Sequence, residues 1–266
     1  MLGVTNICCR PSRGGVKIVT WADGTDEEIV AMVEAADKGD INLADHWHVG
    51  DERKVHLSAM AATGVEESHV EQDVIFVLMH TGGYKLSSGN TCSFVTGMKD
   101  ALIETGYMNL SSEEGIDVSW ESSNRRIWCN NTFKGAIPNT LLPIFKEFKT
   151  ITVKTSYSTE LQTSLDWFAL PAAKEIFGGS TATSVGSATA YSNLTEFNSI
   201  DLFQFDWYKT TNNKIKKDPS SDSNIKWWER SPRGDMSQYF CSVTANGGYF
   251  GGLPRGTAGI SLFGCI

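Results

Sequence analysis

Histidine and cysteine are the side chains through which this chain could bind a metal or attack a substrate. Its five histidines are His46, His48, His56, His69 and His80, and His46-x-His48 is the pair whose spacing could bring two imidazoles to a metal. No cysteine or acidic cluster with ligand spacing completes a site around them. We therefore expect neither a metal nor another cofactor.

The cysteines lie at positions 8, 9, 92, 129, 241 and 265, without a C-x-x-C pair. Reduced thiols are the expectation for such scattered positions. Cys8 and Cys9 are adjacent in a polar leader, where they are either a reactive pair or part of an untethered tail. The C-terminal half has no histidine to activate a nucleophile, and neither Gly-x-Ser-x-Gly nor a phosphate-binding glycine loop occurs. The sequence thus predicts that the protein is not an enzyme.

The tripeptide Arg233-Gly234-Asp235 is a third candidate for chemistry and lies within "WWERSPRGDMSQYF", residues 227–240. It is either an adhesion signal or a chance match, because three-residue motifs match often by chance. The two tryptophans that begin the segment are either a platform for stacking sugars or packing beneath a hairpin. We interpret Trp227 and Trp228 as supports for the loops that follow them.

Composition and charge limit the classes of function. The 266 residues are 41% hydrophobic, which is enough for the core of one main domain. A formal net charge of -8 leaves no basic surface for phosphates, so nucleic acid is not an expected partner. The longest apolar run, residues 74–79, is of strand length, and the first 20 residues lack the features of a signal peptide. We expect a soluble protein without membrane insertion.

Hydrophobic spacing predicts the elements that must position these residues. A helix is expected over residues 26–37, with a capping box formed by Thr25 and Glu28 and a glycine stop at Gly39. Residues 53–60 and 73–81 are rich in β-branched and apolar side chains and predict strands. Helical spacing also recurs further along the chain, and it predicts helices at 93–106, 137–148 and 171–179.

The remaining segments predict loops and C-terminal strands. Residues 111–131 are polar and predict a long ordered loop with buried anchors at Trp120, Trp128 and Cys129, whereas 178–193 predicts an exposed excursion. Asn246-Gly247 predicts a two-residue turn in a hairpin over about 238–250. Residues 259–266 predict a final core strand. This order, with helices first and short strands last, favours an α+β fold.

The C-terminal segments "WWERSPRGDMSQYFCSVTANGG" and "GISLFGCI" resemble those of a family of bacterial and phage proteins. Members end in Trp-Trp-x-Arg-Ser-Pro, then Cys and Asn-Gly, then Phe-x-Cys-Ile. "WADGTDEEI", "VGDERKVHLSAM", "SSNRRIWCNN" and "LPAAKEIFG" extend the similarity to about residues 21–266. The family has a C-type lectin-like fold and includes variable proteins of diversity-generating retroelements. The resemblance implies an α+β domain with small antiparallel sheets, flanking helices and long irregular loops, after a leader at 1–20.

In such proteins an error-prone reverse transcriptase substitutes residues at adenine-rich codons near the C-terminus and leaves the scaffold unchanged. Within a variable region at 227–266, the resemblance implies display positions at about 233–239, 244 and 248–258. Segment 233–239 contains no Asn, unlike unmutated family members, which fits either a diversified copy or a drifted gene without a retroelement. The candidate ligand-binding residues are Arg233, Asp235, Met236, Gln238, Tyr239, Tyr249, Phe250, Leu253 and Arg255.

The resemblance implies that the protein binds a ligand through a diversified surface. It would be a phage tail protein that attaches to a bacterial surface protein or glycan. The N-terminal region would join the phage particle, so the protein would reach a virion tail or a bacterial cell surface by assembly. The calcium-site tripeptides of sugar-binding C-type lectins are absent. The sequence leaves open whether the chain forms a homo-oligomer.

Two alternatives remain beside this function. Formylglycine-generating oxidases share the lectin-like fold and use paired cysteines, and Cys241 and Cys265 are the pair that could serve here. Both lie in apolar, strand-like runs, where a free cysteine usually behaves as a small buried hydrophobe. A purely structural component of a particle is the other alternative.

Overall fold

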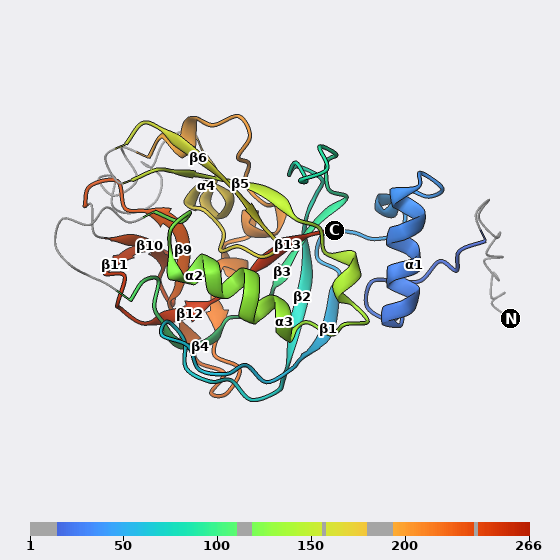
Figure 1. The fold of residues 1–266 in the computed structure, drawn as a ribbon, viewed down its shortest axis with the longest axis horizontal. Helices are drawn as coiled ribbons and strands as arrows, with labels where there is room; N and C mark the ends of the chain where they lie inside the picture. Colours follow the sequence, from blue (N-terminus) through green and yellow to red (C-terminus); the bar gives the residue numbers. More distant parts are fainter. Residues whose placement is uncertain (1–14, 111–118, 156–157, 180–193, 237–238) are drawn as a thin grey trace, which may run out of the picture.

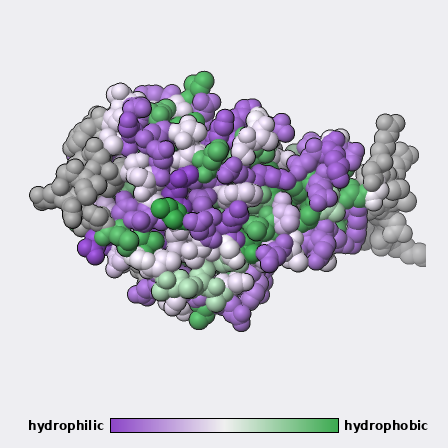
Figure 2. Space-filling view, viewed as in Figure 1, coloured by the Kyte–Doolittle hydropathy of each residue, from purple (hydrophilic) through white to green (hydrophobic). Residues whose placement is uncertain are grey.

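The protein is an α+β chain built from small sheets, few helices and long connections (Figure 1). The computed structural model describes residues 15–110, 119–155, 158–179, 194–236 and 239–266. Within these ranges, no helix has the length and apolar character needed to cross a membrane. On the face that Figure 2 shows, hydrophilic residues predominate and hydrophobic ones form small separate groups.

The first sheet is antiparallel and joins the N-terminal half of the chain to its C-terminal end. Its strand order is β1-β2-β3-β13. Val55 of β1 pairs with Val74 of β2, and Cys265 of β13 pairs with Val95 of β3. The strands are β1 (Glu52–Leu57), β2 (Gln72–Thr81), β3 (Phe94–Met98) and β13 (Phe263–Cys265).

The second sheet carries the C-terminal hairpin and has the order β11-β10-β9-β12-β4. Neighbouring strands within this sheet are antiparallel, except that β12 and β9 run parallel where Gly259 pairs with Trp227. The strands are β4 (Leu102–Gly106), β9 (Trp227–Pro232), β10 (Phe240–Val243), β11 (Tyr249–Gly252) and β12 (Ala258–Ile260). Two further ladders pair β5 (Phe148–Val153) with β6 (Leu161–Asp166), and β7 (Lys216–Lys217) with β8 (Asn224–Ile225).

The predicted N-terminal helix is confirmed as α1 (Asp26–Asp37). The Glu28 N–H donates to the Thr25 hydroxyl, while the Thr25 N–H donates to the Glu28 carboxylate, so the capping box is closed. Gly39 has a φ of 79°, as a C-terminal glycine stop requires. Arg53 of β1 binds Asp26 at 2.5 Å and thereby fixes the start of α1 to the first sheet.

The leader predicted at 1–20 lies largely outside the described residues, but its last residues contact the domain. Val16 and Val19 pack against the hydrophobic core. The Trp47 indole N–H donates to the Val19 carbonyl at 3.0 Å. Residues 15–20 are therefore joined to the domain by packing and by a hydrogen bond.

Residues 93–106 form β3 and β4, so the predicted helix there is wrong. Every residue of β3 is buried, and a strand buried on both faces shows apolar residues at spacings that also suit a helix. A Cβ on Gly97 would lie 2.7 Å from the Leu262 carbonyl oxygen, so the glycine allows two strands to approach closely.

The long ordered loop predicted at 111–131 is also wrong in its second half. Helix α2 (Asn124–Trp128) begins at the N-cap Ser123 and continues through a π turn (Cys129–Phe133) into α3 (Lys134–Ala136). The predicted anchors Trp120, Trp128 and Cys129 are all buried. Trp128 and Cys129 lie on the helical stretch, whereas Trp120 precedes it. Residues 111–118 lie outside the described ranges.

The two shorter predicted helices differ in outcome. Helix α4 (Ala173–Phe177) follows Pro171 as expected, whereas 137–148 contains only a 3₁₀ turn at Leu142–Ile144 before β5 begins. Pro143 lies at the start of that turn, where a missing N–H costs nothing. In the described ranges, the other 3₁₀ turns are Leu43–Asp45, Thr195–Asn198, Asp206–Lys209 and Thr211–Lys214. Most of the exposed excursion predicted at 178–193 falls outside the described residues.

The C-terminal hairpin is confirmed as β10 and β11, but its connection is longer than a two-residue turn. Residues 244–248 join the strands, Gly247 has a φ of 80°, and the Thr244 N–H donates to the Gly248 carbonyl at 2.7 Å. The single final strand predicted at 259–266 is wrong, because β12 joins the second sheet and β13 the first. The last nine residues therefore tie the two sheets together.

Candidate functional site

Strand β9 is a buried platform beneath the candidate display loops. All six of its residues, Trp227–Pro232, are buried. The Trp227 indole N–H donates to the Lys214 carbonyl at 2.9 Å, and that of Trp228 donates to the Gly106 carbonyl at 2.8 Å. Both rings are thus fixed at their polar edge as well as by packing, so the expectation that the tryptophans are packing residues is confirmed.

Trp228 lies directly against the backbone of the candidate loops. A Cβ on Gly252 would lie 2.7 Å from the ring atom Cη2 of Trp228, and one on Gly256 would lie 4.0 Å from Cζ2. The ring therefore supports the backbone at Gly252 in a place where no side chain fits. A residue other than glycine at position 252 would have to displace the indole ring.

A buried ionic network holds the other end of β9. Arg230 donates to both carboxylate oxygens of Glu175, from Nη1 at 2.6 Å and from Nη2 at 2.5 Å, and also to the Leu170 carbonyl. Tyr84 donates to the same carboxylate. Burial alone would lower the pKa of Arg230, but the adjacent Glu175 and Tyr84 raise it, and the net shift is upward. Arg230 therefore stays charged and anchors β9 to α4.

Ser231 links β9 to a second buried carboxyl group. Its hydroxyl donates to Glu196, whose side chain is fully buried. Burial raises the pKa of Glu196 to about 7, although the hydrogen bond from Ser231 and the charge of Arg230 act in the opposite direction. This carboxyl group consequently changes its charge near neutral pH.

The candidate residues of segment 233–239 begin with a closed ion pair. Arg233 binds Asp235 through Nε to Oδ1 at 2.6 Å and through Nη2 to Oδ2 at 3.0 Å. The guanidinium also lies 5.8 Å from the ring centre of Tyr239. The hydrogen bonds that Arg233 donates to Asp235 raise the pKa of Arg233. Met236 is 42% exposed, and Gln238 lies outside the described residues.

The candidate residues on and after β11 divide into exposed and inward-facing groups. Phe250 is 53% exposed, Leu253 is 41% exposed and Arg255 is exposed. Tyr249 is only partly exposed, because it packs on a small cluster that includes Phe197 and Cys241. The implied display stretch 248–258 is thus not uniformly accessible, and its buried members are Gly251, Pro254 and Ala258.

The structure brings the two candidate segments together. A Cβ on Gly251 would lie 2.5 Å from Cδ of Arg233, so the first segment covers the second strand of the hairpin. The Met108 and Asn109 N–H groups donate to the Pro254 carbonyl, which fixes the second segment to the residues that follow β4. Among the described candidates, the outward-facing set is Met236, Phe250, Leu253 and Arg255.

Cys241 and Cys265, the pair considered for the oxidase alternative, have different hydrogen-bond partners. Cys241 and Cys265 are both completely buried, and burial raises the pKa of each thiol well above its ordinary value. The Cys241 thiol donates to the Pro232 carbonyl at 3.5 Å. Cys265 instead shares a hydrogen bond with Cys92, which lowers the pKa of the Cys92 thiol. Cys8 and Cys9 lie outside the described residues.

Four of the histidines, His48, His56, His69 and His80, lie near different carboxylates. His56 contacts Asp73 at 2.8 Å, His69 contacts Glu66 at 3.1 Å and His80 contacts Asp206 at 2.8 Å. His46 and His48 flank Trp47, which is buried. Across the described ranges, no three histidine, cysteine or acidic residues are grouped in a way that could hold a metal ion.

A groove beside α2 was missed by the sequence analysis because its helix was assigned to a loop. Ser123 as N-cap, followed by Asn124, Trp128 and Thr132 at four-residue intervals, was the signal that could have revealed one helical face. The same helix also carries Ile127 and Asn131 into the groove.

A family model described as a domain of unknown function, DUF6273, matches residues 98–260. This range begins at the end of β3 and includes α2, α4 and all five strands of the second sheet. No curated protein and no solved structure matches the chain.

Proposed function

We propose that this protein, which belongs to the DUF6273 family, is a ligand-binding display protein. Its family membership follows from the match, which spans more than half of the chain. In this proposal the domain is C-type lectin-like, and retroelement mutagenesis diversifies its C-terminal loops. The protein would act as a phage tail component that binds a bacterial surface protein or glycan. Fold likeness does not fix function, so the argument depends on the loop surface itself.

The observation that carries the proposal is the separation between a rigid platform and outward-facing side chains. All of β9 is buried and tied down by Trp227, Trp228 and Arg230, whereas Phe250 and Leu253 project from the adjoining hairpin and loop. Substitutions at exposed loop positions cost little stability when the scaffold beneath them is independent of their side chains. Such an arrangement suits a surface that changes while its support does not.

The chemistry of the outward-facing residues favours recognition of a macromolecule. Phe250, Leu253 and Met236 offer apolar contact area, and Arg255 offers a forked guanidinium. Exposed large apolar residues that gather on one loop surface are typical of interfaces. A protein or glycan epitope on a bacterial surface would suit contacts of this kind.

The arrangement of the two ends of the molecule supports attachment through the N-terminal region. Helix α1 and the β10–β11 hairpin lie at opposite ends of the long axis (Figure 1). A protein held to a particle near α1 would therefore present the hairpin away from that particle. Several copies on one particle would raise avidity by roughly 10²–10⁴ where geometry permits simultaneous contact.

The oxidase alternative is weakened by the state of the cysteines. A reactive thiol needs a lowered pKa and access to substrate, whereas Cys241 and Cys265 are completely buried with raised pKa values. We therefore do not propose catalysis.

Binding to intact bacterial cells tests the proposal. A display variant with Ser at Met236, Phe250, Leu253 and Arg255 is compared with a control variant with Ser at Val70, Lys149, Leu165 and Ile200, which are also exposed. Monomeric and artificially multimerised forms of each protein are incubated with cells from the same microbial community. Loss of binding by the display variant alone is the expected result, and equal binding by all three proteins would overturn the proposal.

The retroelement mechanism has a separate test in the neighbouring DNA. A near-copy of the 3′ end of the gene that differs at adenines, beside a reverse transcriptase gene, is the expected finding. If no such near-copy is present, the loops would form a fixed binding surface, and the proposal that a retroelement diversifies them would be wrong.

A further inference from the structure

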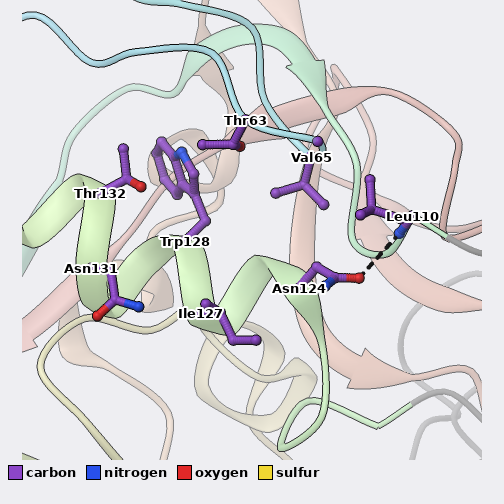
Figure 3. A pocket seen from close by; sticks show the side chains of 9 residues that line it. Thr63, Val65, Leu110, Asn124, Ile127, Trp128, Asn131 and Thr132 are labelled. Atoms are coloured by element: carbon purple, nitrogen blue, oxygen red, sulfur yellow. Dashed lines mark hydrogen bonds between the residues drawn. The ribbon is translucent and has the colours of Figure 1, made fainter.

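The groove beside α2 combines neutral polar groups with apolar walls. It has a volume of about 200 Å³ and lies between α2 and the segment Thr63–Val65 (Figure 3). The apolar walls come from Val65, Leu110 and Ile127, and the latter two side chains are 47% and 53% exposed. The complete lining is Thr63, Gly64, Val65, Leu110, Asn124, Ile127, Trp128, Asn131 and Thr132, none of which is charged.

The walls of the groove are held in place by direct contacts. The Leu110 N–H donates to Oδ1 of Asn124 at 3.3 Å, which ties the Leu110 wall to the first turn of α2 (Figure 3). A Cβ on Gly64 would lie 2.7 Å from a Leu110 methyl group, so the two walls touch at this glycine. The groove is therefore a formed feature of the packed structure.

Trp128 gives the groove an unused hydrogen-bond donor. Its side chain is 3% exposed, and in the described part of the chain its buried indole N–H has no hydrogen-bond partner. The ring nitrogen lies on the edge of the indole that faces Thr63 across the groove (Figure 3). Buried polar groups are normally satisfied, and an unsatisfied donor costs free energy that a ligand acceptor would recover.

One face of the Trp128 ring is already occupied. The Arg125 guanidinium lies 4.9 Å from the ring centre, and Arg125 is itself buried in an ion pair with Glu66 at 2.7 Å. A ligand therefore meets the polar edge of the indole rather than that face of the ring. Recognition would depend on hydrogen bonds, with the apolar contact supplied by the opposite walls.

We propose that this groove binds a neutral sugar unit without a metal. The indole N–H and the Nδ2 group of Asn124 would donate to ring or hydroxyl oxygens, and the Thr63, Thr132 and Asn131 side chains can both donate and accept. Cavities of about 150 Å³ hold a benzene ring, so a volume of about 200 Å³ suits one sugar ring. The absence of charge in the lining selects against phosphates, carboxylates and amines. The site contains none of the display residues and does not depend on the proposed function.

The indole N–H resonances of the full chain test this site directly. In ¹H–¹⁵N spectra, the signal missing from Trp128→Phe identifies Trp128 among the eight tryptophans. Glucose, galactose and N-acetylglucosamine are titrated one at a time, and phenol serves as an apolar ring of similar size. At least one sugar is expected to shift the Trp128 signal with a Kd in the millimolar range, as suits so small a ligand.

Variants on the exposed side of the helix separate binding from stability. Asn131→Ala is expected to weaken binding of that sugar about fivefold, the loss of one hydrogen bond. Asn139→Ala, a change of the same type at an exposed residue outside the groove, should leave the Kd unchanged. No Trp128 shift with any sugar, a shift with phenol alone, or equal Kd values for Asn131→Ala and wild type would overturn the proposal.

Discussion

Arg233 and Asp235 bind each other through two parallel contacts, Nε to Oδ1 at 2.6 Å and Nη2 to Oδ2 at 3.0 Å. The charged ends of the Arg-Gly-Asp tripeptide are therefore engaged within the loop. An adhesion signal would need both charges to face a partner. The two contacts between Arg233 and Asp235 would first have to break, which costs free energy. The geometry favours the interpretation of the tripeptide as part of a loop surface.

The first prediction is that the protein does not support adhesion through this tripeptide. Cells that carry integrins should bind immobilised protein no better than they bind an Asp235→Glu variant. A short linear peptide containing the tripeptide serves as the positive control. Adhesion that is specific to the wild-type protein would show that the ion pair opens readily.

The second prediction compares two adjacent glycines of β11. Gly252→Ala should lower the free energy of unfolding by about 1–3 kcal/mol, because the new Cβ would lie 2.7 Å from the fixed Trp228 ring. Gly251→Ala should cost less, since its Cβ meets the flexible side chain of Arg233. Urea denaturation of both variants measures the difference. Equal losses would mean that Trp228 is free to move.

The third prediction concerns the buried pair of Arg230 and Glu175. Glu175→Gln should lower the free energy of unfolding by about 3–5 kcal/mol, because it leaves Arg230 charged and buried without its partner. Glu160→Gln removes a partner of Lys154 from an exposed pair and should cost less than about 1 kcal/mol. Chemical denaturation of the two variants provides a matched comparison. A small loss for Glu175→Gln would contradict the anchoring role of the network.

The fourth prediction is a pH dependence of stability caused by Glu196. Its pKa rises from 4.5 to about 7 in the folded state, so the folded protein binds this proton more tightly than the unfolded chain. The contribution to stability is fully present below pH 4.5 and is lost as the pH rises through about 7. Its size is on the order of 3 kcal/mol.

A Glu196→Gln variant isolates this contribution, because the amide has no charge at any of these pH values. The free energy of unfolding of wild type minus that of the variant should fall between pH 4.5 and pH 8, by on the order of 3 kcal/mol. Denaturation curves collected across this range give the difference. A difference that is constant with pH would show that Glu196 titrates normally.

The fifth prediction separates two neighbouring aromatic residues. Tyr249→Ala should lower the free energy of unfolding by about 1–3 kcal/mol, because the ring packs on Phe197 and Cys241. Phe250→Ala should change it by less than about 0.5 kcal/mol, since 53% of that residue is exposed. If cells bind the protein, Phe250→Ala should weaken binding at unchanged stability. Thermal unfolding and the cell assay together check both expectations.

Local chemistry was predictable from the sequence wherever neighbouring residues decide the structure. The capping box of Thr25 and Glu28 and the glycine stop at Gly39 define α1 within fifteen residues of chain. The hairpin of β10 and β11 was predicted from the position of Asn246-Gly247 between two strand-like runs. These features depend on backbone hydrogen bonds and φ angles that are set by residues close in sequence.

Long-range pairing was not predictable from the same patterns. Residues 93–106 show helical spacing, yet they form strands because β13 and β12, more than 150 residues later, supply their partners. The pattern of the final eight residues predicts one strand. In the structure the strand is interrupted between β12 and β13, because these two strands belong to different sheets. Tertiary hydrogen bonding overrides local propensity when a segment is buried on both sides.

The candidate site shows the same division. The family resemblance, together with the residue types, marked the loops after Trp227 and Trp228 as a surface with aromatic and guanidinium side chains. Which of those side chains face outward depends on what lies beneath each position: Trp228 under Gly252, the Phe197 cluster under Tyr249, and solvent around Phe250. The sequence by itself determined the chemical inventory of the surface and the local turns. Only the tertiary structure decided which residues are exposed, because exposure depends on packing between segments that are distant in the chain.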